Sequence, residues 1–359
     1  MKHLIDPMDL TKEETLEIIA LAEDIIAHRE RYQGSMSHKK LATLFYEPST
    51  RTRLSFTSAM MELGGNVLGF SDAKNTSVSK GETVQDTVRV VGCFADVIAM
   101  RHYIEGAQLY ASEVSPVPII NAGDGSHSHP TQTMTDLLTI KRELGHIDNI
   151  TIGFCGDLRF GRTVHSLIKA LSRFENIKVI LIAPDELRLP EYIKNDVCEK
   201  MGISYKEVKT MEEVMPELDV LYMTRVQKER FLDEDEFDRV KDSFVLDAKR
   251  MAMAKPKMAV LHPLPRVNEI LTEVDNDPRA AYFRQVENGK FVREALIQKL
   301  LEWKNDPAHG MPEREAPIED ESLHCTNIKC ITTNEHTKHL FHRSDDGTLR
   351  CWYCDSKVK

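Results

Sequence analysis

Five consecutive residues near position 50 have the side chains that bind a phosphate-like anion. The string Ser49-Thr50-Arg51-Thr52-Arg53 follows an apolar segment and opens a predicted helix. Hydroxyls and backbone amides at a helix N-terminus donate hydrogen bonds to an anion, and an arginine binds two phosphate oxygens together. Two arginines and three hydroxyls in five residues exceed what helix capping requires. We therefore predict a phosphate cradle here.

Two polar loops could supply groups that act next to this anion. Residues 121–132 contain His127 and His129 beside glycines and a helix start, and residues 75–83 contain Lys80. Two imidazoles could polarise a carbonyl group, but they could also bind a metal or belong to an ordinary polar loop. No HExxH or carboxylate spacing supports a catalytic metal. A lysine in a loop is most often only solvated, so Lys80 alone decides little.

Arginines in the second half of the chain suit carboxylate groups. Arg162 and Arg225 each follow an apolar segment, and the string His262-Pro263-Leu264-Pro265-Arg266 follows a third. The GxGxxG spacing of a dinucleotide site is absent, whereas clustered arginines bind carboxylates well. No nucleophile with a partnered base is evident, which favours direct attack of one bound substrate on the other.

The seven cysteines are unevenly placed, and four of them lie beyond residue 324. These four are Cys325, Cys330, Cys351 and Cys354. Four thiolates at this spacing complete a closed tetrahedral zinc site, so we predict one structural Zn²⁺ ion per chain. Residues 321–359 hold six Lys or Arg and five acids without a basic aromatic stripe, which argues against nucleic-acid binding.

The elements that must position these motifs alternate between strand and helix. Buried parallel strands are predicted at 41–45, 97–100, 150–155, 179–183, 220–222 and 258–261. With helices between them, these strands favour an α/β fold of two doubly wound parallel-sheet domains that bind ligands at the carboxyl ends of the strands. Residues 305–324 contain three prolines and six acids against one arginine, which predicts a flexible linker before a small zinc-binding β domain.

The overall composition excludes several classes of protein. With 359 residues, 41% hydrophobic residues and a net charge of -10, the chain is typical of globular proteins of two or three domains. The negative balance argues against a nucleic-acid or membrane-surface binder. The longest apolar runs are far shorter than a membrane span, and the N-terminus lacks the apolar core of a secretory signal. We therefore expect a cytoplasmic protein.

Three strings together resemble the signatures of the carbamoyltransferases, over residues 1 to about 305. They are Ser49-Thr50-Arg51-Thr52-Arg53, His129-Pro130-Thr131-Gln132 and His262-Pro263-Leu264-Pro265. Within that family, Glu47 and Pro263 resemble the aspartate branch, because ornithine carbamoyltransferases typically carry Lys and Cys there. The string at residues 222–230 extends the match.

The resemblance implies the reaction and its site residues. Carbamoyl phosphate and L-aspartate would give N-carbamoyl-L-aspartate and phosphate, the committed step of de novo pyrimidine biosynthesis, without a catalytic cofactor. The implied contacts are Ser49, Thr50, Arg51 and Thr52 to the phosphate; Thr52, Arg101 and His129 to the carbonyl oxygen; Gln132 to the carbamoyl amide; Arg162, Arg225 and Gln227 to the carboxylates of aspartate; and the Pro263-Leu264 backbone to substrate amino groups.

The resemblance also implies an assembly and a domain order. Ser77 and Lys80 would reach in from a neighbouring subunit, which makes the active unit a homotrimer with shared sites, although the spacing between them is a residue shorter than in some relatives. We expect a carbamoyl-phosphate-binding domain at 1–134, completed by a helix at 290–304, and an aspartate-binding domain at 135–289. The linker would span 305–320 and the zinc-binding domain 321–359.

The cysteine strings Cys325-Thr326-Asn327-Ile328-Lys329-Cys330-Ile331 and Cys351-Trp352-Tyr353-Cys354 resemble the zinc domain of the aspartate carbamoyltransferase regulatory chain. In that chain the zinc domain docks onto catalytic subunits. We hypothesise that the module packs on a neighbouring catalytic chain and supports a higher assembly. Two alternatives remain: a carbamoyltransferase for another amine such as ornithine, and a zinc-dependent scaffold with an inactive enzyme domain.

Overall fold

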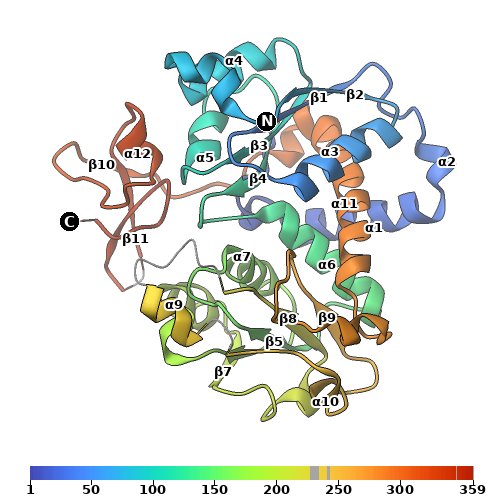
Figure 1. Ribbon diagram of the computed structural model, residues 1–359. Helices are drawn as coiled ribbons and strands as arrows, with labels where there is room; N and C mark the ends of the chain where they lie inside the picture. The colour runs from blue at the N-terminus through green and yellow to red at the C-terminus, as the bar shows by residue number, and fades with distance from the viewer. Residues whose placement is uncertain (227–233, 241–242, 345, 359) are drawn as a thin grey trace. The chain divides into compact units, whose positions relative to one another are not determined.

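The computed structural model describes residues 1–226, 234–240, 243–344 and 346–358, and the chain divides into two compact units (Figure 1). Unit 1 contains Met1–Met134 and Gly289–Lys359, and unit 2 contains Thr135–Asn288. The chain passes between them in two helices, α6 (Pro130–Leu144) and α11 (Tyr282–Glu302). Among the described residues, no helix is both long and apolar enough to cross a membrane.

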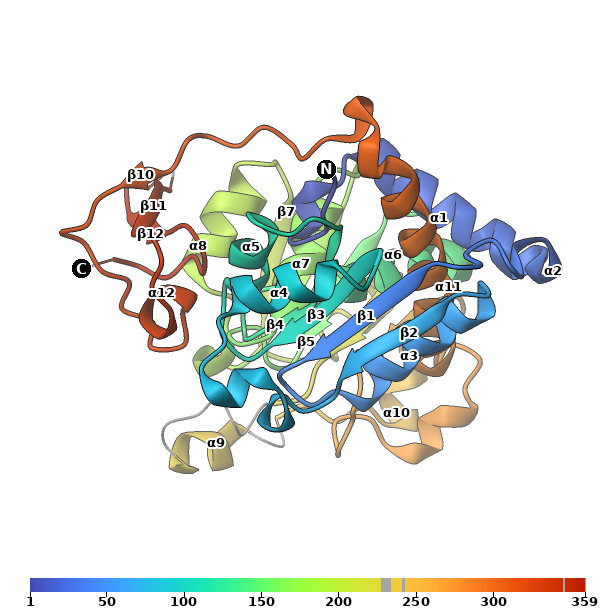
Figure 2. The same cartoon turned by 90° about the horizontal axis from the view of Figure 1, so that it is seen from above.

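Unit 1 is built on a four-stranded parallel sheet in the order β2-β1-β3-β4, which Figure 2 shows side by side. The strands are β1 (Lys40–Phe45), β2 (Asn66–Phe70), β3 (Val97–His102) and β4 (Ile119–Asp124). The helices are α1 (Lys12–Ala27), α2 (Arg29–Tyr32), α3 (Thr50–Glu62), α4 (Val84–Gly92) and α5 (Ala107–Ser112). Apolar side chains of α4 and α5 pack with those of β1, β3 and β4 in one core, which leaves the strand ends for polar residues.

Unit 2 has a five-stranded parallel sheet in the order β7-β6-β5-β8-β9. The strands are β5 (Thr151–Cys155), β6 (Lys178–Ile182), β7 (Ser204–Val208), β8 (Val220–Met223) and β9 (Ala259–Leu261). The helices are α7 (Arg162–Leu171), α8 (Glu191–Ile193), α9 (Glu234–Val240) and α10 (Ala248–Met251). The strand order reverses between β5 and β8, which is where such sheets bind ligands.

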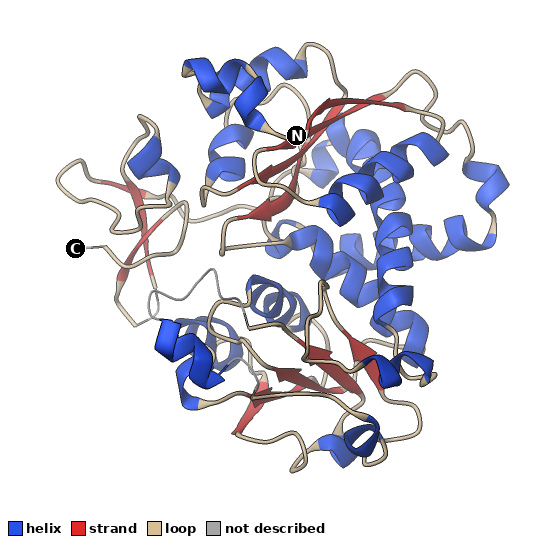
Figure 3. Ribbon diagram, viewed as in Figure 1, coloured by secondary structure: helices blue, strands red, loops and turns tan. Residues whose placement is uncertain are grey.

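The C-terminal module is a small antiparallel sheet in the order β10-β11-β12, visible as short red arrows in Figure 3. Its elements are β10 (Ile318–Glu319), α12 (Ile331–Asn334), β11 (Leu340–Arg343) and β12 (Leu349–Cys351). The predicted fold class, two parallel-sheet α/β domains and a small β domain, is confirmed. The module packs against the rest of unit 1, and the hypothesis that it packs on a neighbouring chain stays a prediction.

The linker before the module is fastened to the N-terminus. Lys2 is only 1% exposed, and its ammonium group donates a hydrogen bond to the carbonyl of Gly310 over 3.0 Å. The imidazole of His309 lies 3.0 Å from the carboxylate of Glu14, which also pairs with Lys2 at 2.8 Å. Side chains of the N-terminal segment and of α1 therefore contact the start of the linker, and its flexibility stays a prediction.

Candidate active site and metal centre

The predicted phosphate cradle lies at the start of α3, directly after β1. Ser49 is the N-cap residue, and its side chain makes no capping hydrogen bond to the helix. Thr50 and Arg51 are exposed, while Thr52 is 9% exposed. The first turn of the helix thus presents hydroxyls, a guanidinium group and backbone amides at one end, which is the arrangement that binds anions.

Arg101 lies beside the cradle at the end of the neighbouring strand. It pairs in register with Phe45 at the end of β1, and its Nη2 is 3.0 Å from Oε2 of Glu47. The guanidinium group passes over Gly123, where an added Cβ would lie 2.7 Å from Nη1. A side chain at that position would therefore displace Arg101. Gly123 also has a φ of +127°, a conformation that favours glycine.

The two histidines of the loop after β4 have different surroundings. His129, 5% exposed, precedes α6, and its Nδ1 is 3.5 Å from Oγ1 of Thr131. His127 instead bridges two carboxylates, with Nδ1 3.0 Å from Asp124 and Nε2 3.2 Å from Asp355 of the C-terminal module. Burial opposes a charge on His127, but these hydrogen bonds outweigh it and raise its pKa well above the ordinary value.

The strand order brings the first half of the predicted site together. β1, β3 and β4 are adjacent and parallel, so the cradle, Arg101 and His129 all lie at or after the carboxyl ends of neighbouring strands. Gln132 lies in the first turn of α6, where its backbone amide donates a hydrogen bond to the backbone carbonyl of His129 over 3.0 Å. These residues form one polar edge of the sheet in unit 1.

Within the described residues, the contacts of Ser77 and Lys80 do not join them to this edge. They begin and end a short 3₁₀ helix, Ser77–Lys80, and both are exposed. Thr76 caps this turn by accepting a hydrogen bond from the amide of Val78 over 3.3 Å. In the described part of the chain, Lys80 forms no ion pair with an acidic side chain.

The arginines predicted to bind carboxylates follow two adjacent strands of unit 2. Arg162 is the first residue of α7, in the segment after β5, and Arg225 follows β8 by two residues. Thr224 joins the two loops: its hydroxyl accepts from the amide of Asp157 over 2.8 Å and donates to the carbonyl of Cys155 over 2.9 Å. Gln227 lies outside the described residues.

The Pro263-Leu264 turn after β9 is held by a buried His–Glu pair. Nδ1 of His262 accepts from the amide of Leu264 over 2.7 Å, so its Nε2 carries the proton that it donates to Glu269 over 2.8 Å. The other carboxylate oxygen of Glu269 accepts from the amide of Val267 over 2.9 Å. Burial favours a protonated Glu269, but the hydrogen bonds from His262 and Val267 prevail and lower its pKa. Sequence reasoning missed Glu269.

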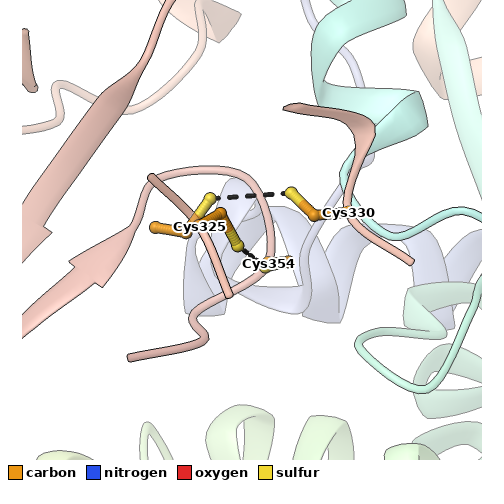
Figure 4. A group of neighbouring side chains, drawn as sticks. Cys325, Cys330 and Cys354 are labelled. Atoms are coloured by element: carbon orange, nitrogen blue, oxygen red, sulfur yellow. Dashed lines mark hydrogen bonds between the residues drawn. The ribbon is translucent and has the colours of Figure 1, made fainter. Parts of the chain in front are cut away.

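The four C-terminal cysteines converge, and Figure 4 shows three of them facing one another. All four Sγ atoms lie within 4.8 Å of one another, with 3.5 Å between Cys325 and Cys354 and 3.6 Å between Cys330 and Cys351. Sulfur atoms of a tetrahedral ZnS₄ centre lie about 3.8 Å apart, given Zn–S bonds of about 2.3 Å. Hydrogen bonds from Cys330, then Cys351 and Cys354, lower the pKa of Cys325. The donor set therefore fits a closed metal centre.

Models of one protein family match both halves of the chain. The carbamoyl-P binding domain of aspartate/ornithine carbamoyltransferase matches residues 2–142, and the Asp/Orn binding domain matches residues 148–300. The aspartate carbamoyltransferase catalytic subunit of Lachnoclostridium phytofermentans is 62% identical over 301 residues, which are 84% of this chain and 98% of that relative. The chain belongs to the aspartate/ornithine carbamoyltransferase family. The metal binding domain of the aspartate carbamoyltransferase regulatory chain matches residues 318–359.

Other members of this family place the chain in the aspartate branch. The aspartate carbamoyltransferase catalytic subunit of Clostridium acetobutylicum is 60% identical over 300 residues, or 84% of this chain and 98% of that one. The catalytic subunit of M. jannaschii aspartate transcarbamoylase superposes with a TM-score of 0.79 at 49% identity, covering 86% of this chain and all of that one. A Trypanosoma cruzi aspartate transcarbamoylase solved with carbamoyl phosphate and aspartate gives a TM-score of 0.78 at 40% identity, covering 82% and 95%.

These matches confirm the predicted carbamoyltransferase and its predicted activity, carbamoyl transfer to aspartate. They also confirm the likeness of the C-terminal module to the metal binding domain of a regulatory chain. Because the matched 301 residues already cover 98% of the catalytic subunit from Lachnoclostridium phytofermentans, that relative has little room for a counterpart of this module. The module distinguishes this member of the family from the catalytic subunits that it resembles.

Proposed function

We propose that the chain binds carbamoyl phosphate at the edge formed by β1, β3 and β4 and transfers its carbamoyl group to the α-amine of L-aspartate. The observation that supports this most directly is the cradle at the start of α3 next to Arg101 and His129, at the carboxyl ends of three adjacent strands. Ser49, Thr50, Arg51 and Thr52 bind the phosphate group.

The reaction needs positioning and charge stabilisation more than it needs a nucleophilic side chain. The neutral amine of aspartate attacks the carbonyl carbon, and negative charge develops on the carbonyl oxygen. Arg101, His129 and Thr52 donate hydrogen bonds to that oxygen, while Gln132 holds the carbamoyl amide. The C–N bond forms, the C–O bond to phosphate breaks, and the phosphate leaves with the proton that the amine gives up. Holding the two substrates together supplies much of the acceleration.

Aspartate is held by unit 2 in this proposal. Arg162 and Arg225 bind its carboxylates, because both residues lie in segments that follow the carboxyl ends of adjacent strands. Gln227 has the same role, and the Pro263-Leu264 backbone receives substrate amino groups. Ornithine carries an amine where aspartate carries a carboxylate, so an arginine pair disfavours it.

The proposed active unit is a homotrimer with shared sites. Ser77 and Lys80 are exposed on a turn, at positions from which they can serve a neighbouring subunit. The four C-terminal cysteines hold one Zn²⁺ ion that stabilises the module and takes no part in the reaction. A higher assembly through the module and a cytoplasmic location remain predictions from the sequence.

Substrate turnover by the purified protein and two arginine variants tests the proposal. Carbamoyl phosphate with aspartate should give carbamoyl aspartate, and Arg51→Ala should lower kcat by about 10²- to 10³-fold, the loss expected for one charge-stabilising donor. Arg89→Ala is the matched control, because Arg89 is 54% exposed on α4 and pairs only with Asp86 among the described ion pairs. Turnover of ornithine but not aspartate, or an unchanged rate for Arg51→Ala, would contradict the proposal.

A further inference from the structure

The C-terminal module is continuous with the core of unit 1 on the face covered by α4 and α5. Ile331, Leu340 and Tyr353 of the module belong to the same buried cluster as Ile104 and Ala107 at the start of α5. The contact is close: a Cβ on Gly106 would lie 2.5 Å from the Cβ of Tyr353. The module therefore lies directly against the loop that follows β3.

Glu105 joins the module to both loops that follow β3 and β4. Its amide donates to the carbonyl of Lys329 over 2.8 Å, and one carboxylate oxygen accepts from the side chain of Asn327 over 2.7 Å. The other carboxylate oxygen accepts from the amide of Ser126 over 3.0 Å. Glu105 is only 8% exposed, so this single carboxylate connects the module to the loop before His129.

A second connection runs through His127 and Asp124. Asp355 of the module contacts Nε2 of His127 at 3.2 Å, and Nδ1 of His127 contacts one oxygen of Asp124 at 3.0 Å. The other oxygen of Asp124 accepts a hydrogen bond from the amide of Gly106 over 2.9 Å. Gly106 belongs to the loop after β3, so this contact links the two loops. Asp355 is itself held by His342 of β11 over 2.8 Å. The two connections form a continuous hydrogen-bonded frame.

This frame ends next to the residues that handle the carbamoyl group. Arg101 lies four positions before Glu105, and His129 lies two positions after His127. We propose that the C-terminal module positions the carbamoyl phosphate site, with Asn327 and Asp355 acting through Glu105 and His127 on the loops that carry Arg101 and His129. The inference rests on the proposed roles of those two residues, and it treats the frame residues as positioning residues that touch no substrate.

Removing the two module side chains tests this inference in the full-length chain. Asn327→Ala and Asp355→Ala should each lower kcat/KM for carbamoyl phosphate by about tenfold, because small displacements of positioned groups are costly, while the KM for aspartate changes little. Tyr353→Phe is the matched control. It removes the hydroxyl that donates to the carboxylate of Glu113 over 3.3 Å. This contact belongs to the same interface but lies at the far end of α5 and does not reach either loop. It should leave kcat/KM unchanged.

A second readout does not depend on activity. Hydrogen exchange at the amides of Gly106 and Ser126, which donate to Asp124 and Glu105, should be faster in Asp355→Ala than in Tyr353→Phe. Unchanged exchange and unchanged kcat/KM in a variant that keeps its metal would overturn the inference. An inactive wild-type protein with the expected exchange pattern would instead refute the proposed function.

Asp355 directly follows the predicted metal ligand Cys354, so Asp355→Ala could also lose its metal. A variant on the other side of the interface tests the same connection without changing the module. His127→Asn leaves the module intact and should reproduce the kinetic change. The double variant His127→Asn/Asp355→Ala should be no worse than the more affected single variant, because the two side chains act in one connection. Independent, multiplying losses would contradict that connection.

Discussion

His102 should make the stability of unit 1 depend on pH in the mildly acidic range. It ends β3 with only 3% of its surface exposed, and its Nδ1 accepts a hydrogen bond from the amide of Ile104 over 2.9 Å. Its ring packs against that of Tyr46, with 4.3 Å between the ring centroids. Burial lowers its pKa from 6.5 to about 3. The folded chain therefore keeps His102 neutral at pH values at which the unfolded chain protonates it.

The sign and size of the effect follow from this difference. Because the pKa of the folded state is the lower one, the contribution to stability is fully present above pH 6.5 and is lost as the pH falls towards 3. Between pH 7 and pH 5, protonation of this histidine in the unfolded state lowers the free energy of unfolding by about 2 kcal/mol. In His102→Asn the side-chain oxygen can still accept the amide of Ile104, but it does not titrate.

Urea unfolding at pH 7 and pH 5 measures the difference. The protein has two tryptophans, Trp303 and Trp352, and both lie in unit 1, so their fluorescence follows this unit. His102→Asn should lose about 2 kcal/mol less than the wild type between the two pH values. Metal loss and association affect both proteins alike at equal concentration. His38→Asn, at an exposed histidine of unit 1, should keep the wild-type dependence. Equal losses in the wild type and His102→Asn would refute the reasoning.

Two further variants test the site. Glu269→Gln should raise the KM for aspartate by about tenfold and leave the KM for carbamoyl phosphate unchanged, because His262, which holds the turn, loses its charged partner. Steady-state kinetics with each substrate varied in turn measure the two constants. Wild-type values for both would contradict the prediction. We expect Lys80→Ala and Arg51→Ala each to have little activity alone. After mild dissociation and mixing, the two variants together should regain activity, because some shared sites then combine an intact Lys80 with an intact Arg51. No recovery in verified hybrids would exclude shared sites.

The sequence predicted the elements that position the site because strand ends in parallel sheets have a local signature. The apolar runs before Arg51, Arg101 and Arg225 are short and buried, and polar residues follow each one directly. The strand order, which puts Arg101 beside the cradle in unit 1 and the segments of Arg162 and Arg225 after adjacent strands in unit 2, is not local. The sequence analysis predicted no strand order; the family resemblance, which the matches with aspartate carbamoyltransferases then confirmed, indicated instead which residues to expect in the site.

Other parts of the site had no readable signal in the sequence. Glu105, Asp124 and Asp355 are acids among many, and only the three-dimensional contact of the module with two loops distinguishes them. The two histidines of the loop after β4 could not be told apart by spacing. His127 contacts Asp124, three positions before it, and also Asp355, which lies 228 positions further along the chain, and no local spacing signals the second contact.

The fastening of the linker to the N-terminus has a consequence for how the module stays in place. When such a module is on a separate chain, the fraction of binding surfaces that it occupies depends on the ratio of its concentration to its dissociation constant. Here the chain connects the module to the surface, and Lys2 and Glu14 shorten the part of the tether that can move. Such a tether corresponds to an effective concentration in the millimolar range, which dilution does not change. An interface with a dissociation constant well below about 1 mM would therefore remain closed in nearly every molecule.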